Sequence, residues 1–235
     1  MFLNKLFVLL LMCLILGFSA TALAQKENLM KKIYAYYPLD GNTIDQGPNQ
    51  LHGEEVDQDR STEDRFGNKD SALSFTDEND FLRLPANINP KKMPQLTVAL
   101  WLKVEKTKGI STILSHNDGR FDRSIIIDGR KNSALLSVFA GNNQQVYGGI
   151  NIPLNKWVFT AISWNAKNGN VSLYLIDQNK NFSVISTNNV NPGPGKDFIT
   201  LGKNPAAGDF FIGTMDQLMI WDQVLTADQI KSLAF

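Results

Sequence analysis

Residues 96–104 read Leu-Thr-Val-Ala-Leu-Trp-Leu-Lys-Val, and this stretch decides the fold class. Successive side chains of a strand point to opposite faces, so five aliphatic residues share one face while Thr97, Ala99, Trp101 and Lys103 share the other. Both faces are largely apolar, and burial of each large apolar side chain contributes about 1.5 to 3 kcal/mol. The stretch therefore predicts a central strand of a layered structure, and Trp101 is predicted to be a buried residue.

Similar short runs of β-branched and aromatic residues recur about every ten residues, separated by clusters of Gly, Asn, Asp and Pro. Further strands are predicted at residues 33–39, 72–75, 81–84, 111–115, 124–128, 134–140, 145–147, 157–164, 171–176, 182–187, 198–202 and 210–221. Many strands without helices between them cannot build a parallel sheet, and they favour an antiparallel sandwich or barrel. The sequence predicts an all-β domain.

One short helix is predicted at the C-terminus. Residues 226–229, Thr-Ala-Asp-Gln, form a capping-box pattern ahead of Ile230 and Leu233. No linker or internal repeat divides residues 33–235, so this range is predicted to be one domain. The polar stretch Glu54–Asp70 is predicted to be a long solvated loop.

The charge balance narrows the class of partner. The 235 residues contain 23 Lys plus Arg and 23 Asp plus Glu, so the net charge is zero. A binder of nucleic acid, or a protein held electrostatically at a membrane surface, needs a basic excess that this chain lacks. A polyanionic macromolecule is therefore not the expected partner.

The first residues have the pattern of a secretory signal peptide. Lys5 precedes an apolar run over residues 6–17, which is too short for a membrane span, and Ala22 and Ala24 form an A-x-A cleavage site. We predict a signal peptide at residues 1–24, a lead-in at residues 25–32, and secretion to the periplasm or the medium. The only cysteine, Cys13, would leave with the signal peptide, which excludes disulfides and cysteine catalysis in the product.

Two segments carry a family resemblance. Residues 37–53 read YPLDGNTIDQGPNQLHG, and residues 211–226 read FIGTMDQLMIWDQVLT. Together they resemble the opening and closing signatures of the laminin G-like family, within the concanavalin A-like lectin/glucanase superfamily. Residues 97–103, 155–161, 171–174 and 200–202 follow in the order of that family. The resemblance implies a jelly-roll β-sandwich of two antiparallel sheets, with the first and last strands close together and often a calcium ion between them.

A candidate metal site follows from the residues themselves. On residues 210–221 strict alternation gives Asp216 the same face as Leu218 and Ile220, where a lone carboxylate costs several kcal/mol unless it is paired or binds a metal. Asp40 and Asn42 lie in a glycine-punctuated loop and offer the hard oxygen ligands that Ca²⁺ takes. We predict a calcium site of Asp40, Asn42 and Asp216. In the alternative, Asp216 accepts backbone N–H groups and Asp40 only initiates a turn.

Catalysis is not expected from the sequence. Glucanases of the superfamily place two glutamates and an aspartate on one strand, because acid and nucleophile must lie about 5 Å apart. The nearest pattern here, residues 55–60, lacks the second glutamate and falls in the polar stretch. His52 and His116 are far apart in the chain, and no nucleophile-elbow or phosphate-loop motif occurs. A glycoside hydrolase is kept as a lesser alternative.

A non-catalytic binding module remains, for carbohydrate or for an extracellular protein, since a fold does not fix its ligand. Sugars are held by hydrogen bonds and aromatic contacts, so the polar loops are the expected binding surfaces. The candidate ligand-binding residues are Arg120, Asp122, Arg123 and Tyr147. In the alternative, these loops are solvated hairpins with exposed ion pairs worth about 0 to 1 kcal/mol. A structural or adhesion protein with a protein partner is the second class of function.

Overall fold

The computed structural model of this chain describes residues 23–54, 60–116, 123–131, 133–139 and 146–234. Two compact units are distinguished, one comprising Ile33–Val224 and the other comprising the segments Met1–Lys32 and Leu225–Phe235. The strands of the described residues, β1 to β14, all lie in the unit Ile33–Val224.

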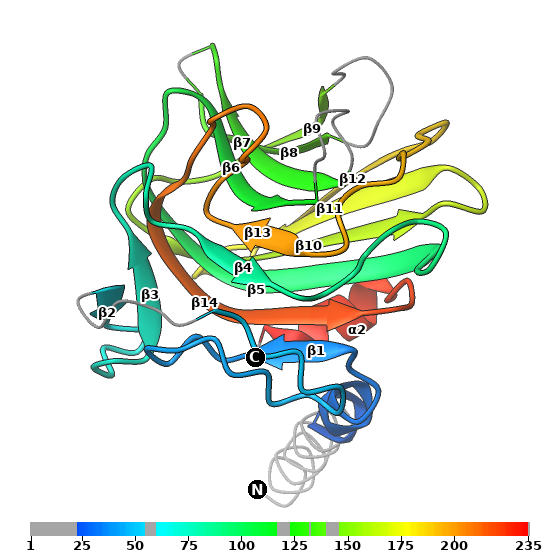
Figure 1. Cartoon of the computed structure of the whole chain (residues 1–235), viewed down its shortest axis with the longest axis horizontal. Helices are drawn as coiled ribbons and strands as arrows, with labels where there is room; N and C mark the ends of the chain where they lie inside the picture. Colours follow the sequence, from blue (N-terminus) through cyan, green and yellow to red (C-terminus); the bar gives the residue numbers. More distant parts are fainter. Residues whose placement is uncertain (1–22, 55–59, 117–122, 132, 140–145, 235) are drawn as a thin grey trace, which may run out of the picture. The chain divides into compact units, whose positions relative to one another are not determined.

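The larger of the two sheets in this unit has the strand order β12-β11-β10-β5-β14-β3-β2, and β1 pairs with β14 as well. Every pairing in it is antiparallel. Its strands are β1 (Ala35–Tyr37), β2 (Ser61–Thr62), β3 (Ala72–Phe75), β5 (Gln95–Lys106), β10 (Trp157–Asn165), β11 (Asn170–Ile176), β12 (Phe182–Thr187) and β14 (Ile212–Trp221). Residues 96–104, which the sequence predicts to be a central strand, lie in β5, and β5 lies between β10 and β14 (Figure 1).

The second sheet is also antiparallel and has the order β4-β13-β6-β7-β8-β9. Its strands are β4 (Leu82–Leu84), β6 (Gly109–Ser115), β7 (Ser124–Gly129), β8 (Leu135–Phe139), β9 (Val146–Asn151) and β13 (Ile199–Leu201). Figure 1 shows this sheet as a separate layer above β5 and β14. The predicted two-sheet sandwich is confirmed.

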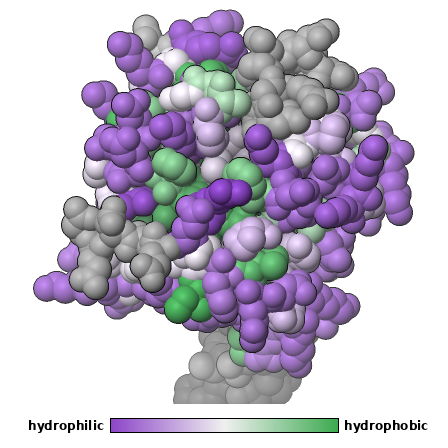
Figure 2. Space-filling model, in the orientation of Figure 1, coloured by the Kyte–Doolittle hydropathy of each residue, from purple (hydrophilic) through white to green (hydrophobic). Residues whose placement is uncertain are grey.

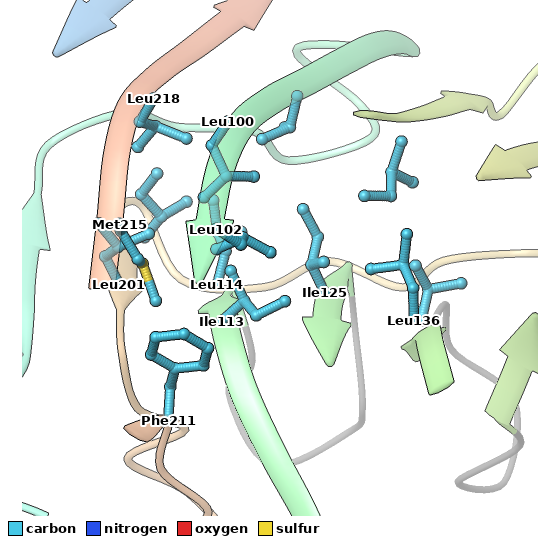
Figure 3. Packing of buried hydrophobic residues seen from close by; sticks show 14 of the residues in the cluster. Leu100, Leu102, Ile113, Leu114, Ile125, Leu136, Leu201, Phe211, Met215 and Leu218 are labelled. Atoms are coloured by element: carbon cyan, nitrogen blue, oxygen red, sulfur yellow. The ribbon is translucent and has the colours of Figure 1, made fainter. Parts of the chain in front are cut away.

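The core fills the space between the layers. Leu100 and Leu102 of β5 and Met215 of β14 point toward side chains of the second sheet such as Leu114 and Ile125 (Figure 3), and all of them are fully buried. The predicted alternation of β5 is confirmed, because its five aliphatic residues belong to this core. The other face of β5 is covered too, since Trp101 is only 5 % exposed. The hydrophobic effect therefore acts on both faces of this strand.

The first and last strands of the sandwich pair directly, as the family resemblance implies. In the antiparallel register of β1 and β14, Ala35 lies opposite Ile220 and Tyr37 lies opposite Leu218. On its other side β14 pairs with β5, and that ladder carries a register shift between Asp216 and Met219. Gln217 stands in the shift with a left-handed φ of 54°.

This shift corrects the predicted face of Asp216. A β-bulge adds a residue to one strand and so breaks strict alternation. Met215 and Leu218 both belong to the core, whereas Asp216 lies opposite Trp101 on the outer face of the larger sheet. Strict alternation predicted that Asp216 shares a face with Leu218 and Ile220. In the structure it lies on the opposite face of β14. It is nevertheless buried, with 1 % of its surface exposed.

Most strand boundaries agree with the sequence analysis within a few residues. β3 and β12 coincide with the predicted ranges, and β9 runs on to Asn151, beyond the predicted end at residue 147. The prediction of a solvated loop at residues 54–70 is wrong in two respects: β2 lies within it, and Arg60 is buried. The Arg60 Nε atom donates to the Ser74 carbonyl at 3.2 Å, so this stretch is held against β3.

The other unit contains the predicted C-terminal helix, α2 (Ala227–Leu233). Thr226 caps it, and the Thr226 and Gln229 side chains form the predicted capping box with each other's backbone N–H groups. Residues 23–30 are helical as well. Among the described residues, no helix has the length and apolar character that a membrane span requires.

Candidate functional site

The buried Asp216 carboxylate has a cation as its partner. Arg65, which follows β2 in the chain, donates from Nη1 to Asp216 Oδ2 at 2.7 Å. The pair is largely out of water, with 14 % of the arginine side chain and 2 % of the aspartate side chain exposed. Charge-assisted hydrogen bonds of this length are the strong ones. The expectation that Asp216 needs a partner is met by a guanidinium group from a distant loop.

Two aromatic rings hold the same guanidinium group. Arg65 Cζ lies 4.5 Å from the centre of the Trp101 ring and 4.3 Å from the centre of the Phe66 ring. Trp101 in turn packs on Phe159 of β10, with ring centres 5.4 Å apart. Cation–π contacts are stronger when the cation is desolvated, as it is here. Arg65 therefore fixes its loop to the outer face of the larger sheet.

Two further carboxylates act electrostatically on Asp216. Burial raises the pKa of Asp216 to about 7, Arg65 opposes the rise, and the charges of Asp64 and Asp40 add to it. Burial and the charge of Asp64 also raise the pKa of Asp40. The charges of Asp40, Asp64 and Arg65 therefore all act on Asp216. Because Asp216 is the most buried of the three acids, its ionisation is the least favourable.

The predicted calcium ligands do not fit a metal ion as they are arranged. Asp216 is occupied by Arg65, and the Asn42 side-chain oxygen accepts the Ile44 backbone N–H at 2.9 Å. Asn42 also donates from Nδ2 to the Asp40 carbonyl at 2.7 Å, so it closes its own loop. Within the described part of the chain, no three acidic, histidine or cysteine side chains converge as a metal site. Calcium at Asp40, Asn42 and Asp216 stays a prediction from the sequence and from the family resemblance.

Asp45, in the same loop, has a structural part that the sequence analysis missed. It is buried, and its carboxylate accepts the backbone N–H groups of Tyr36 at 2.7 Å, Gly47 at 2.7 Å and Leu51 at 2.8 Å. A carboxylate satisfied by three backbone donors needs no metal ion. Acceptance of backbone N–H groups was the alternative to calcium that the sequence offered for Asp216, and in the structure it is Asp45 that has this arrangement.

A polar hollow of about 570 Å³ is lined in part by Asp64, the residue before Arg65, and we refer to it as the hollow beside Arg65. It is lined by Ser61, Thr62, Glu63, Asp64, Lys69, Asp70, Lys103 and Trp157. Lys103 of β5 lies opposite Trp157 of β10 in the ladder, and its Nζ atom stands 5.7 Å from the centre of the indole ring. Hydroxyl groups, carboxylates, ammonium groups and an aromatic ring thus share one concave surface. Such a set can bind a ligand rich in hydroxyl groups.

Arg123 is not where the sequence analysis predicted it. It was expected on an exposed loop, but it is fully buried directly before β7. Its Nη1 atom donates to the carbonyls of Ile88 and Met93, both at 2.7 Å. Burial lowers the pKa of Arg123 to about 10, so the group stays protonated at neutral pH. A fully buried side chain does not present itself to a surface ligand, and its contacts are those of a residue that holds a loop.

The remaining predicted ligand residues are only partly described. Tyr147 lies in β9 opposite Val138 and packs, partly buried, against the core, so it is not a freely exposed platform. Arg120 and Asp122 lie outside the described residues. Their predicted role in ligand binding stays a prediction.

The residues considered for catalysis are the glucanase-like pattern at residues 55–60 and the two histidines. Residues 55–59, the nearest glucanase-like pattern, lie outside the described part of the chain. His52 accepts the Asp45 backbone N–H on Nδ1 at 3.1 Å, and His116 is fully buried. His52 therefore contributes a hydrogen bond to the loop of Asp45, whereas His116 belongs to the interior.

A family model agrees with this architecture. The model described as the concanavalin A-like lectin/glucanases superfamily, of the laminin G type, matches residues 76–231, which is more than half of the chain. The chain belongs to this superfamily. The match confirms the resemblance that the terminal signatures indicated.

Curated relatives are distant. Mouse neuronal pentraxin-2 is 25 % identical over 154 residues, which are 61 % of this chain and 35 % of the relative. The chain thus spans about a third of the length of the first curated relatives that it matches.

Solved structures with this fold include two binding proteins. Domain 4 of AbnA, an extracellular arabinanase of family GH43 from Geobacillus stearothermophilus, was solved in complex with arabinotriose; it is 22 % identical, with a TM-score of 0.58, over 87 % of this chain and 98 % of that one. The binding domain of botulinum neurotoxin DC, in complex with rat synaptotagmin II, is 14 % identical with a TM-score of 0.62, over 87 % of this chain and 51 % of that one. At these identities the likeness concerns the fold alone.

Proposed function

We propose that this chain is an exported, non-catalytic carbohydrate-binding module whose binding surface is the hollow beside Arg65. The observation that carries the proposal is the lining of the hollow, where hydroxyl, carboxylate and ammonium groups lie together with Trp157, of which 7 % is exposed. Sugars combine many hydroxyl groups with apolar ring faces, and sites that bind them combine hydrogen-bonding side chains with an aromatic group. The AbnA domain, which has the same fold and was solved with arabinotriose, supports carbohydrate as the ligand class.

The lining of the hollow suits a polar ligand, because every lining residue except Trp157 carries a hydroxyl or a charged group. On the one face of the molecule that Figure 2 shows, hydrophilic residues predominate and the hydrophobic residues form small separate patches. Large apolar patches usually mark docking surfaces for proteins or membranes. The floor of the hollow is rigid, because Lys103 and Trp157 stand on paired strands at the centre of the sheet. Preorganised groups bind with a smaller loss of conformational entropy.

Calcium is not part of this binding mechanism. The sequence predicts a calcium ion at Asp40, Asn42 and Asp216, but Arg65 already balances the charge of Asp216. We therefore expect binding at the hollow to be unchanged by a chelator. Calorimetry with Ca²⁺ tests the predicted ion separately: heat in the wild type that is absent from Asp40→Asn would support the ion, and no heat in either would remove it.

An oligosaccharide array, followed by calorimetry, tests the proposed function. We expect at least one neutral oligosaccharide, with arabinotriose among the probes, to bind the wild type and to bind at least fivefold more weakly when Glu63→Gln and Asp70→Asn are combined. Both residues are exposed, so the fold should be unaffected. Asp222→Asn removes an exposed carboxylate outside the hollow and should bind as the wild type does.

Two outcomes would overturn the proposal. Release of free sugar from a bound oligosaccharide would indicate a glycoside hydrolase. Silence across the array, together with capture of one defined extracellular protein that the Glu63 and Asp70 substitutions abolish, would favour an adhesion protein. The neurotoxin binding domain, solved with synaptotagmin II, shows that this fold also serves a protein partner.

A further inference from the structure

A second, smaller hollow of about 250 Å³ lies at the C-terminal end of β5, and the proposed function does not use it. It is lined by Lys106, Lys108, Ile110, Ser111, Gly208, Asp209, Phe210 and Ile212. None of these residues lines the hollow beside Arg65. The two hollows can therefore be tested independently.

Two connections of the chain build this pocket. β5 and β6 are joined by a short turn in which Gly109 takes a left-handed φ of 71°, a conformation that favours glycine. The segment between β13 and β14 returns to the same place, where Phe210 bridges to Lys203 and Ile212 lies opposite Lys106. The Phe211 backbone N–H donates to the Gly202 carbonyl at 2.8 Å, and this bond fixes the segment beside the sheet.

The charged groups of the pocket have no partners in the described structure. Among the described residues, no ion pair or hydrogen bond engages the ammonium groups of Lys106 and Lys108, both of which are exposed. The neighbouring lysines differ: Lys103 pairs with Glu105 at 3.9 Å, and Lys203 donates to the Glu78 carbonyl at 2.7 Å.

Asp209 is the one acid among the residues that line this pocket. It is half-buried, and burial raises its pKa above the ordinary value of an aspartate. Within the described residues its carboxylate makes no hydrogen bond or ion pair of its own. Two cations and one acid leave a net positive charge at the pocket, beside the apolar side chains of Ile110, Phe210 and Ile212.

We propose that this pocket binds one carboxylate-bearing sugar residue of a glycan, such as a uronic acid or a sialic acid unit. Lys106 and Lys108 would hold the carboxylate, Phe210 would contact the apolar face of the ring, and Asp209 would accept from a sugar hydroxyl group. Each of these contacts matches one feature of an acidic sugar.

The size and the charge of the pocket restrict the ligand. Pockets for drug-sized ligands hold roughly 300 to 1,000 Å³, so a pocket of about 250 Å³ has room for one sugar ring, and the rest of a glycan would extend beyond it. A phosphate group carries more negative charge and would face the Asp209 carboxylate. A sugar ring with a single carboxylate can place that carboxylate at the two lysines and donate a hydroxyl group to Asp209.

This inference rests on the proposed function only in taking a glycan as the ligand, and a matched pair of probes separates the two. Methyl β-glucuronide and methyl β-glucoside differ only in the carboxylate at C6, and methyl α-sialoside is a third probe. In NMR titrations of the wild type we expect the glucuronide or the sialoside to shift the amide signals of Gly109 and Gly208, with at least fivefold higher affinity than the glucoside.

Three variants complete the test. Combining Lys106→Gln with Lys108→Gln should abolish the preference for the acidic probe, and Phe210→Ala should weaken its binding at least threefold. Lys167→Gln, at an exposed lysine in the turn after β10, should leave the preference unchanged. The lysines are exposed, so the double variant should unfold at the wild-type temperature.

The outcomes are distinguishable. Equal affinity for the glucuronide and the glucoside, or an acidic preference that survives the double lysine variant, would overturn the inference while leaving binding at the other hollow intact. Conversely, loss of oligosaccharide binding on combining Glu63→Gln with Asp70→Asn should leave the shifts at Gly109 and Gly208 unchanged. If dextran sulfate competes as well as the glucuronide does, only unspecific charge attraction is present and the inference is wrong.

Discussion

Arg65 and Arg123 are both removed from water, but their surroundings differ. Arg65 has a carboxylate at 2.7 Å and two aromatic rings around its guanidinium group. Arg123 is fully buried, donates to two backbone carbonyls, and has no acidic partner among the described residues. The first arginine compensates a buried charge, whereas the second satisfies the backbone of a loop and has no counter-ion within the described part of the chain. Stability should therefore respond differently to the loss of each.

The largest effect is expected at Arg123. Arg123→Ala leaves a cavity and two buried carbonyls without donors, and we expect a loss of about 3 kcal/mol in the free energy of unfolding. Arg123→Met keeps most of the volume and removes a buried charge that has no acidic partner among the described residues, so it should recover about half of that loss. Urea unfolding measures both variants.

The Met variant decides what Arg123 contributes. If Met is as destabilising as Ala, the hydrogen bonds to Ile88 and Met93 outweigh the cost of burying the charge. If neither variant unfolds earlier than the wild type, the guanidinium group does not hold this loop, and the contrast with Arg65 fails.

The fold could be predicted from the sequence because its signal is repeated in every strand. In β5 the alternation of apolar residues specifies a strand that is covered on both faces, and burial of its aliphatic residues and of Trp101 confirms it. The capping box at Thr226 is equally local, since both of its partners lie within four residues. Features of this kind depend on short-range periodicity and on known turn chemistry.

The surroundings of Asp216 could be predicted only in part. That this acid needs compensation followed from its apolar neighbours, but the register shift at Gln217 has no signature in the sequence and turned the side chain to the other face. Its partner, Arg65, lies 151 residues away in the chain. The one available signal was the pair Arg65-Phe66, a cation next to a large aromatic residue in an otherwise polar loop. Tertiary contacts of this kind are not encoded locally.

A smaller loss is expected on removing Arg65, and it should depend on pH. Arg65→Ala leaves Asp216 without its cation, which we expect to cost about 2 kcal/mol at pH 8. The folded-state pKa of Asp216 is raised to about 7. An acid whose pKa is higher in the folded state than in the unfolded state contributes stability that is fully present below its unfolded-state pKa. This contribution is lost as the pH rises through the folded-state pKa. Without Arg65 this pKa rises further, so the variant should lose more stability than the wild type between pH 5 and pH 8.

Asp216→Asn is the matched control for that dependence. It removes the titrating group, so Arg65→Ala made in this background should cost nearly the same at pH 5 and at pH 8. Thermal unfolding of the wild type, the two single variants and the double variant at both pH values gives the coupling between the residues. Equal losses at pH 5 and pH 8 for Arg65→Ala alone would show that the guanidinium group acts through packing on Trp101 and not through the charge of Asp216.

The smallest effect is expected at Phe66, which covers the outer side of Arg65. Its ring centre lies 4.3 Å from the guanidinium carbon, but 73 % of the residue is exposed. Exposed cation–π contacts are worth about 0.5 to 1 kcal/mol, so Phe66→Leu should lower the free energy of unfolding by no more than that. The variant should also speed hydrogen exchange in the loop around Asn68, because Arg65 is one of the residues that hold this loop to the sheet. Exchange as slow as in the wild type would mean that Trp101 and Asp216 hold Arg65 without help from Phe66. Trp101 would then be the one aromatic ring of the two that distinguishes the surroundings of Arg65 from those of Arg123.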